Sequence, residues 1–236
     1  QKKRIVIKLG TSTLTHKTGK LNIRRMTNLV QVLSDLHNAG KEILLVSSGA
    51  IGMGVGKLNL PERPKDTPSK QAAAAVGQCS LMYLYDKFFG DYDKTVAQIL
   101  LNAEDIEQEE KKENLINTFN ALLEMGVIPI VNENDSVSYK EIESEDRLFG
   151  DNDMLSAVVA VLCRAKHLVI LSDIDGFYDH DPRLYPNARL IEQIDTIDDS
   201  VYALAGGAGS RRGTGGMRTK LQAAALATSQ GTNTIV

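Results

Sequence analysis

The sequence has few cysteines, no long apolar run and no excess of charge of one sign. Two cysteines, Cys79 and Cys163, cannot form a disulfide framework in a chain of 236 residues, which indicates a reducing compartment such as the cytoplasm. No apolar stretch approaches the roughly 18 residues of a membrane span, and no secretory signal precedes the first apolar run. The formal net charge of −3 gives no global basic footprint for nucleic acid. We therefore expect a cytoplasmic globular protein with neither a membrane nor a nucleic-acid partner.

Two common nucleotide-binding motifs and one hydrolase motif are also missing. The spacing G-x-x-x-x-G-K-[ST] does not occur, and no G-x-G-x-x-G follows the first apolar run. Ser48 lacks the surrounding G-x-S-x-G and has no histidine nearby, which argues against a serine hydrolase. The missing G-x-G-x-x-G after the first apolar run also argues against a Rossmann oxidoreductase, which a measurement of NAD(H) binding would test.

Apolar, β-branched runs alternate with helical patterns along the whole chain. Such continuous runs are typical of buried strands in a parallel sheet. The expected strands are 4–12, 42–46, 95–101, 127–131, 167–171 and 234–236, and the expected helices are 23–36, 69–89, 114–125, 154–159 and 221–229. A hydrophobic content of 42% is enough for a sizeable core, and the unbroken alternation favours one α/β domain spanning residues 1–236.

The stretch 126–157 brings polar residues to a strand end and to a helix start. The apolar run 127–131 stops at Asn132-Glu133-Asn134-Asp135, and Gly150-Asp151-Asn152-Asp153 precedes an apolar helix. Ligands of open α/β sheets bind outside the carboxyl ends of the strands. The two clusters are therefore expected to bracket one crevice, although ordinary turn and cap chemistry explains either cluster alone equally well.

Other expected strands deliver further polar groups to the same edge. The first ends at Lys8 and a glycine turn, the second at Ser48 and the glycine-rich segment 49–54, and a later one at Ser172 and Asp173. Glycines in such turns permit close backbone approach to a ligand. A glycine-rich connection without a ligand is the alternative.

The stretch 204–220 combines six glycines, three arginines and one lysine ahead of a helix. A glycine loop that enters a helix is a phosphate cradle by geometry and dipole. Two lysines, Lys8 and Lys220, suit phosphoryl transfer, which needs fixed positive charge around the transferred group. Asp153 is expected to hold both ammonium groups, while Ser48, Asp135 and Asn152 are candidates to bind a small polar acceptor.

Six ordered motifs together resemble the amino acid kinase family, and within it the members that phosphorylate glutamate. The motifs are VIKLGTS at 6–12, VSSGAI at 46–51, VNEND at 131–135, FGDND at 149–153, SDIDG at 172–176 and GTGGMRTK at 213–220. Aspartokinase, N-acetylglutamate kinase and uridylate kinase share the fold but carry different substrate-side motifs. The resemblance implies a three-layer αβα sandwich with a mainly parallel central sheet.

The resemblance also implies an activity, ATP-dependent phosphorylation of the side-chain carboxylate of L-glutamate to L-glutamyl 5-phosphate, the first step of proline biosynthesis. Carried over by motif, Lys8, Lys220 and Asp153 are catalytic, and Ser48, Asp135 and Asn152 bind glutamate. The implied nucleotide-binding residues are Lys8, Ser172, Asp173, Thr214, Gly215, Gly216, Met217, Arg218, Thr219 and Lys220. Magnesium would arrive with ATP, without a metal site of the protein's own.

Regulation and partners follow from the same resemblance. Proline is the expected feedback inhibitor, a glutamyl phosphate reductase the expected downstream partner, and a homodimer or homotetramer the expected assembly. The charged stretch 138–148 is the candidate for the loop that responds to proline, although a stretch of this composition is more commonly a solvated loop. Many bacterial relatives continue into a C-terminal PUA domain. No such domain follows in this chain, so either the parent protein lacks it or the chain is cut.

Two alternatives within the family stay open. One is a kinase that acts on a different small acid, which a panel of acceptors would distinguish. The other is a non-catalytic sensor of proline or glutamate. The presence of Lys8, Asp153 and Lys220 argues against the sensor. A protein that does not transfer a phosphoryl group has no physical need for two positive charges beside that group.

Overall fold

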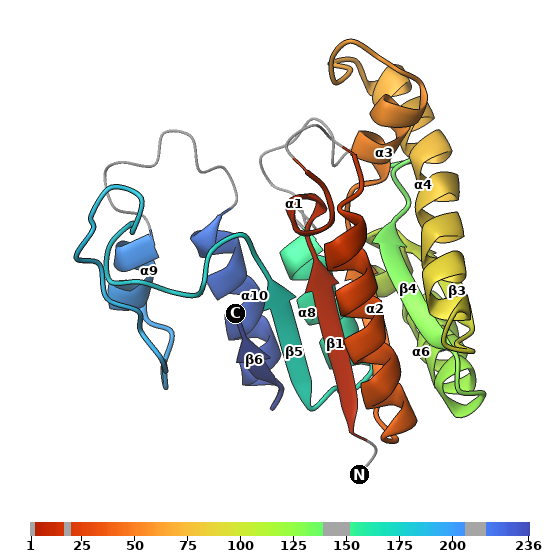
Figure 1. The fold of residues 1–236 in the computed structure, drawn as a ribbon. Helices are drawn as coiled ribbons and strands as arrows, with labels where there is room; N and C mark the ends of the chain where they lie inside the picture. Colours follow the sequence, from red (N-terminus) through yellow and green to blue (C-terminus); the bar gives the residue numbers. More distant parts are fainter. Residues whose placement is uncertain (1–2, 17–19, 139–151, 206–215) are drawn as a thin grey trace.

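The fold is built on one six-stranded parallel sheet (Figure 1). The computed structural model describes residues 3–16, 20–138, 152–205 and 216–236. Its strands are β1 (Arg4–Leu9), β2 (Glu42–Ser47), β3 (Val96–Leu101), β4 (Ile128–Glu133), β5 (His167–Leu171) and β6 (Asn233–Ile235). They lie in the order β3-β4-β2-β1-β5-β6, and every neighbouring pair is parallel. All strands therefore end at the same edge, which is the edge the sequence predicted for the polar residues.

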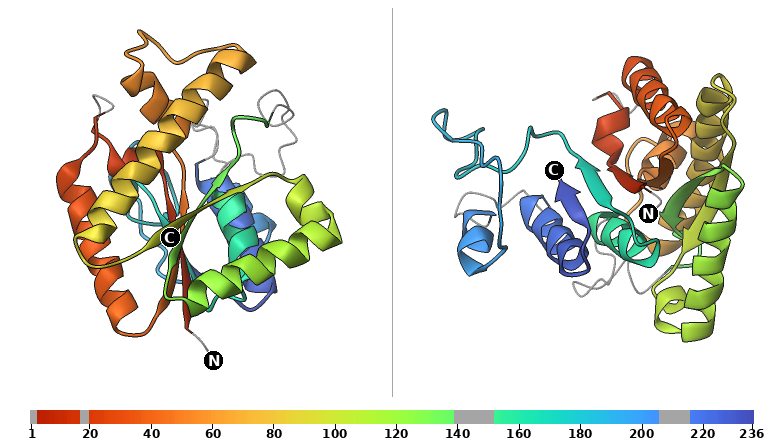
Figure 2. Two further views of the ribbon diagram at one scale, coloured as in Figure 1. Left: turned by 90° about the vertical axis from the view of Figure 1, so that its right-hand side faces the viewer. Right: turned by 90° about the horizontal axis from the view of Figure 1, so that it is seen from below.

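Helices cover both faces of the sheet and complete three layers (Figure 2). The helices are α1 (Thr11–Leu14), α2 (Ile23–Asn38), α3 (Ala50–Lys57), α4 (Thr67–Gly90), α5 (Glu104–Glu107), α6 (Glu109–Glu124), α8 (Asn152–Leu162), α9 (Asp199–Ala205) and α10 (Met217–Ser229). One buried core joins the sheet to α2 and α4, and the other joins it to α6, α8 and α10. The predicted three-layer αβα sandwich with a parallel sheet is confirmed.

Strand β1 shows how the sequence builds both cores. Its side chains alternate, so Ile7 packs with the α2 and α4 side while Val6 packs with the α8 and α10 side. Lys8 lies two residues after Val6 and shares its face. The period of the strand thus sends the Lys8 side chain toward α8 and α10, although the chain around it is apolar.

The predicted elements are present, with differences at their boundaries. Helix α2 ends at Asn38, and Gly40 follows its C-cap as expected, with a φ of 84° that is easiest for glycine. Ile23 at the start of the helix is 65% exposed and does not join the buried stripe. Helix α6 starts at Glu109, five residues before the predicted start at residue 114, because acidic residues in its first turn favour a helix N-terminus without adding apolar periodicity. The short helices α1, α5 and α9 were not predicted.

The segment 49–54, predicted as a ligand-binding glycine turn, is a turn only at its beginning. Gly49 takes a left-handed φ of 105°, and α3 begins at the next residue. A Cβ on Gly54 would lie 1.8 Å from the carbonyl oxygen of Ala73, and one on Gly77 would lie 1.6 Å from that of Ala50. These two glycines therefore serve backbone contact between α3 and α4, which corrects the expectation that glycine at position 54 receives a ligand.

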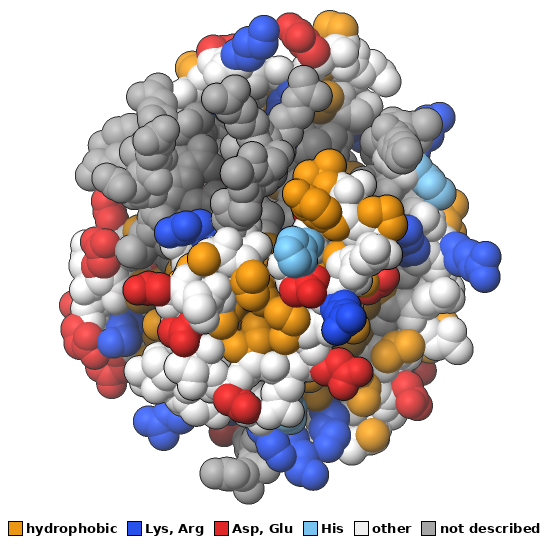
Figure 3. Space-filling view, turned by 90° about the vertical axis from the view of Figure 1, so that its left-hand side faces the viewer, with side chains coloured by type: hydrophobic (Ala, Val, Ile, Leu, Met, Phe, Trp, Pro, Cys, Tyr) orange, Lys and Arg blue, Asp and Glu red, His pale blue; other side chains and the backbone are white. Residues whose placement is uncertain are grey.

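Helix α9 and the segment before it lie outside the sandwich, beyond the β6 edge of the sheet (Figure 1). On the face seen from that side, hydrophobic side chains are interspersed with acidic and basic ones (Figure 3). The exposed large hydrophobic residues of this part of the chain are Leu184, Tyr185, Leu190, Leu204 and Ile235. Within the described ranges, no helix is both long enough and apolar enough to cross a bilayer.

Candidate active site

Three charged side chains from distant parts of the chain meet at the carboxyl end of β1. Lys8 Nζ lies 2.8 Å from Asp153 Oδ1, and Lys220 Nζ lies 3.1 Å from Asp153 Oδ2. The Thr219 hydroxyl donates a hydrogen bond of 2.9 Å to the same Oδ2. Asp153 is fully buried, and the two lysines are 5% and 8% exposed. The sequence-predicted catalytic trio of Lys8, Asp153 and Lys220 is thus one contiguous cluster.

The two ammonium groups decide the charge state of this carboxylate. Burial alone raises the pKa of Asp153. The nearby charges of Lys8 and Lys220 and the hydrogen bonds to Asp153 lower the pKa by more than burial raises it, so the pKa lies below the usual range. Asp153 is therefore ionised at neutral pH. With one carboxylate between two ammonium groups, the cluster keeps an excess positive charge, which suits an anionic ligand rich in oxygen atoms.

Each member of the cluster is placed by a different element. Lys8 is the last residue but one of β1, Asp153 lies in the first turn of α8, and Lys220 lies in the first turn of α10. The starts of two helices thus face the end of one strand. Helix N-termini add partial positive charge to the same region, which further favours a negatively charged ligand.

The predicted acceptor residues lie around the ends of β2 and β4. Ser48 directly follows β2, and its hydroxyl donates a hydrogen bond of 3.1 Å to the carbonyl oxygen of Leu9 at the end of β1. Asn152 Nδ2 donates a hydrogen bond of 3.1 Å to Oδ1 of Asn132, the last residue but one of β4. Asp135 is half-buried in the turn that follows β4. The adjacent strands β1, β2 and β4 therefore bring these segments to one edge.

The predicted nucleotide residues divide into described and undescribed parts. The Ser172 hydroxyl donates 3.4 Å to Asp173 Oδ1 directly after β5, and Gly216 caps α10. The guanidinium carbon of Arg218 lies 5.7 Å from the centre of the Tyr202 ring of α9. Met217 is half-buried in the first turn of α10. Thr214 and Gly215, like the candidate responsive loop after Ser138, lie outside the described residues.

Several supporting residues were missed in the sequence. Asn132 is 2% exposed and links Asn152 to Gln78 of α4, whose Oε1 accepts a hydrogen bond of 3.1 Å from Asn132 Nδ2. Tyr85 of α4 and Ser47 share a buried hydrogen bond of 2.7 Å between their hydroxyls, and burial raises the pKa of Tyr85 above its ordinary value. The sequence carries no signal for these contacts, because polar residues are common in helices and the partners lie far apart in the chain.

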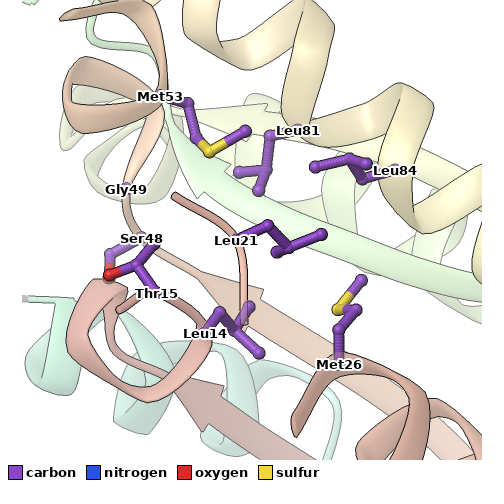
Figure 4. Close-up of a pocket in the computed structure, with 9 residues that line it drawn as sticks. All are labelled: Leu14, Thr15, Leu21, Met26, Ser48, Gly49, Met53, Leu81 and Leu84. Atoms are coloured by element: carbon purple, nitrogen blue, oxygen red, sulfur yellow. The ribbon is translucent and has the colours of Figure 1, made fainter. Parts of the chain in front are cut away.

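A small apolar pocket lies on the opposite face of the sheet, next to Ser48 (Figure 4). It is lined by Leu14, Thr15, Leu21, Met26, Ser48, Gly49, Met53, Leu81 and Leu84. Leucine and methionine side chains dominate the lining, so the pocket offers no charged partner for a carboxylate acceptor. Among the described residues, no group of three or more histidine, cysteine or carboxylate side chains is arranged to hold a metal ion.

Comparison with known proteins places this geometry among kinases. The model of the amino acid kinase family matches residues 3–236. A glutamate 5-kinase of Clostridium perfringens (strain 13 / Type A) is 55% identical over 234 residues, which cover 99% of this chain and 87% of the relative. A glutamate 5-kinase of Listeria welshimeri (serovar 6b) is 54% identical over 222 residues, covering 94% and 80%.

Solved structures with low sequence identity share the fold. Carbamate kinase from Giardia lamblia bound to AMP-PNP superposes with a TM-score of 0.65 at 15% identity, covering 98% of this chain and 91% of that chain. The isopentenyl phosphate kinase of T. acidophilum in a product complex gives a TM-score of 0.64 at 17% identity, covering 98% and 90%. These likenesses confirm the architecture.

Proposed function

The chain belongs to the amino acid kinase family, and from that premise we propose that it transfers a phosphoryl group from ATP to the side-chain carboxylate of L-glutamate. The product is L-glutamyl 5-phosphate, the first intermediate of proline biosynthesis. The observation that carries the proposal is the buried cluster of Lys8, Asp153 and Lys220 in a chain 55% identical to a glutamate 5-kinase. The chain is accordingly a kinase whose acceptor group is a carboxylate.

The chemistry requires positioning and fixed charge more than covalent help from the protein. A carboxylate oxygen of glutamate attacks the γ-phosphorus of ATP, the bond to the β-phosphate oxygen breaks, and ADP leaves. Lys8 and Lys220 carry ammonium groups that stabilise negative charge on the transferred group, and Asp153 holds both in place. Because the cluster is almost completely buried, its charges act with little screening by water.

The acceptor side is assigned to Ser48, Asp135 and Asn152. A carboxylate suits the ammonium group of an amino acid, while hydroxyl and amide groups suit its carboxylate and carbonyl oxygens. The location of these residues at the ends of β2 and β4 and at the start of α8 supports this assignment. Asn152 is adjacent in sequence to Asp153, so α8 connects acceptor binding to the ammonium groups directly.

The nucleotide side is assigned to Ser172 and Asp173 after β5 and to residues 214–220. The N-terminus of α10 with Lys220 fits phosphate oxygens by charge and by the backbone N–H groups of its first turn. Magnesium, bound through the phosphates and water, would supply further charge neutralisation there. The protein's part is to hold the phosphates against Lys8 and Lys220.

Five broader features belong to the same proposal. Residues 1–236 are taken as a single amino acid kinase domain, supported by one continuous sheet and a family match over 3–236. The protein acts in the cytoplasm. It forms a homodimer or homotetramer, for which α4 offers small and exposed residues, including Tyr83 at 64% exposure. Proline inhibits it, and a glutamyl phosphate reductase consumes its labile product.

The test is ATP turnover with hydroxylamine present, which traps an acyl phosphate as a hydroxamate. We expect hydroxamate with L-glutamate and none with D-glutamate, aspartate or N-acetylglutamate. Adding proline should suppress the reaction. Hydroxamate from a different acid in the panel would contradict the assigned acceptor, and ATP binding without any hydroxamate would favour the sensor alternative.

The same assay tests the phosphoryl role of Lys220. A Lys220→Ala enzyme is expected to lose about a hundredfold or more in kcat, because one of two buried positive charges is removed from the transferred group. Exposed Lys57 at the end of α3 offers a matched control, Lys57→Ala, with expected wild-type turnover. Near-normal turnover of Lys220→Ala would rule out the role.

A further inference from the structure

A chain of four side-chain amides runs from the start of α8 to the outer strand of the sheet. Asn152 Nδ2 donates to Asn132 Oδ1, Asn132 Nδ2 donates to Gln78 Oε1, and Gln78 Nε2 donates to Gln98 Oε1, each at 3.1 Å. The chain connects four elements, α8, β4, α4 and β3, at the acceptor side of the site.

The direction of this chain is fixed by the backbone. The N–H of Glu133 donates 2.9 Å to Asn132 Oδ1, and a backbone N–H can only donate. Asn132 must therefore present its oxygen to Glu133 and Asn152, and its amino group to Gln78. Only a hydrogen-bond acceptor at position 78 completes this arrangement, because Asn132 is 2% exposed and water cannot substitute easily.

Gln78 is itself held in place by close packing of its helix. The preceding residue, Gly77, lies so near α3 that a Cβ there would come within 1.6 Å of the Ala50 carbonyl oxygen. Two further polar contacts lie seven residues to either side on α4. Gln71 Nε2 donates 3.3 Å to the carbonyl oxygen of Ser138, and Tyr85 shares its hydroxyl hydrogen bond with Ser47. Residues seven apart share one helix face, so α4 presents a polar stripe to the carboxyl ends of β2 and β4 and to Ser138 after β4.

From this geometry we infer that Gln78 is a positioning residue for the acceptor, acting on Asn152 through Asn132. The inference rests on the proposed function, in which Asn152 binds the acceptor. Without the Gln78 oxygen, the buried amino group of Asn132 lacks an acceptor, and rotation toward another one withdraws its own oxygen from Asn152. The Asn152 side chain then loses its orientation, while Lys8, Asp153 and Lys220 keep theirs.

The experiment compares Gln78→Met, which keeps length but removes the acceptor, with Gln78→Glu, which keeps an oxygen facing Asn132. Gln78→Met is expected to raise the KM for L-glutamate about tenfold and leave the KM for ATP within about twofold, since one buried hydrogen bond is lost on the acceptor side only. Gln78→Glu should recover most of this loss, because exposed Gln98 can turn its amino group toward a carboxylate. Gln31→Met on the exposed side of α2 is the matched control and should equal wild type.

Other outcomes would overturn the inference. An unchanged glutamate KM in Gln78→Met, an equal rise in both KM values, or a Gln78→Glu enzyme as impaired as Gln78→Met would each do so. Gln98→Met provides a second, milder variant at the exposed end, with an expected effect smaller than that of Gln78→Met because water can accept from Gln78 Nε2.

A readout without turnover separates this inference from the proposed function. In ¹⁵N-labelled protein, the side-chain amide signals of Asn132 and Asn152 should shift in Gln78→Met and stay in place in Gln31→Met. If the wild type makes no hydroxamate from L-glutamate, the proposed function fails while these signals still test the amide chain. If the signals do not move, the amide chain fails whatever the turnover.

Discussion

At the scale of single residues, Asp153 has the largest influence on the site. It is fully buried and shared by two ammonium groups that come from opposite ends of the sequence. A buried charge without a partner is much more costly than a buried pair. The two buried lysines depend on the Asp153 carboxylate and Asp153 depends on them, so stability and chemistry depend on the same atoms.

Replacing Asp153 with asparagine should damage both properties. Two buried ammonium groups would face each other without a carboxylate, so we expect a loss of about 3–5 kcal/mol in the free energy of unfolding. We also expect kcat to fall about a hundredfold or more. Urea titration and the hydroxamate assay measure the two effects. Asp86→Asn on the exposed side of α4 is the control and should change neither.

The difference in the free energy of unfolding between wild type and Asp153→Asn should depend on pH, because the pKa of Asp153 is lowered in the folded state. A carboxylate whose pKa is lower in the folded than in the unfolded state stabilises the fold above its unfolded pKa, here the ordinary value of 3.8. That stabilisation is lost as the pH falls through the folded-state pKa. The gap in stability between wild type and Asp153→Asn should thus be constant near neutral pH and narrow below about pH 4. A gap that widens on acidification would contradict this assignment.

At the scale of elements, the contact between α3 and α4 is the most sharply defined. Gly77→Ala should cost about 1–3 kcal/mol or more, since a methyl group cannot fit 1.6 Å from the Ala50 carbonyl oxygen without separating the helices. Because Gln78 is the next residue, the KM for L-glutamate should also rise. Gly56→Ala in α3 is the matched control, with nothing within 4 Å of its added Cβ. It should be neutral or slightly stabilising, as alanine favours a helix over glycine.

Helices α2 and α4 and the sheet show where sequence reasoning succeeds, and Gly54 of α3 shows where it stops. Apolar periodicity predicts α2, an alanine-rich run predicts α4, and the apolar, β-branched runs predict all six strands, because burial favours such patterns. Gly54 could not be assigned correctly from sequence. A glycine that lets a ligand approach and a glycine that lets a neighbouring helix approach both serve by lacking a Cβ. Only the fold distinguishes the two cases.

Site residues were predictable to different degrees for a physical reason. Lys8, Asp153 and Lys220 are charged residues in apolar or glycine-rich surroundings, which is costly unless they act together. Asn132 was identified only as part of a polar strand end. Gln78 gave no signal, because glutamine is common in helices and its importance arises from a contact 54 positions away in the sequence.

At the scale of the whole molecule, Cys163 reports on the integrity of the sandwich. It is 2% exposed, burial raises the pKa of its thiol to about 12, and its carbonyl oxygen accepts a hydrogen bond of 2.9 Å from Arg4 of β1. A thiol reacts as the thiolate, so this one should be inert in the native state. In a Cys79→Ser background, a chromogenic thiol reagent should modify native protein at least about a hundredfold more slowly than urea-unfolded protein. Rapid labelling of the native protein would show that the α8 end opens locally.

The cluster that joins positions 8, 153 and 220 also has a consequence for the protein's synthesis. Lys8 leaves the ribosome first, but its carboxylate partner follows more than half a chain later and the second ammonium group close to the end of the described domain. With the role proposed for Lys220, a growing polypeptide is expected to consume no ATP before α10 has been made. A chain interrupted before α10 also lacks the buried apolar residues of that helix, so translational errors of this kind should yield a product that is inactive, poorly folded and readily degraded.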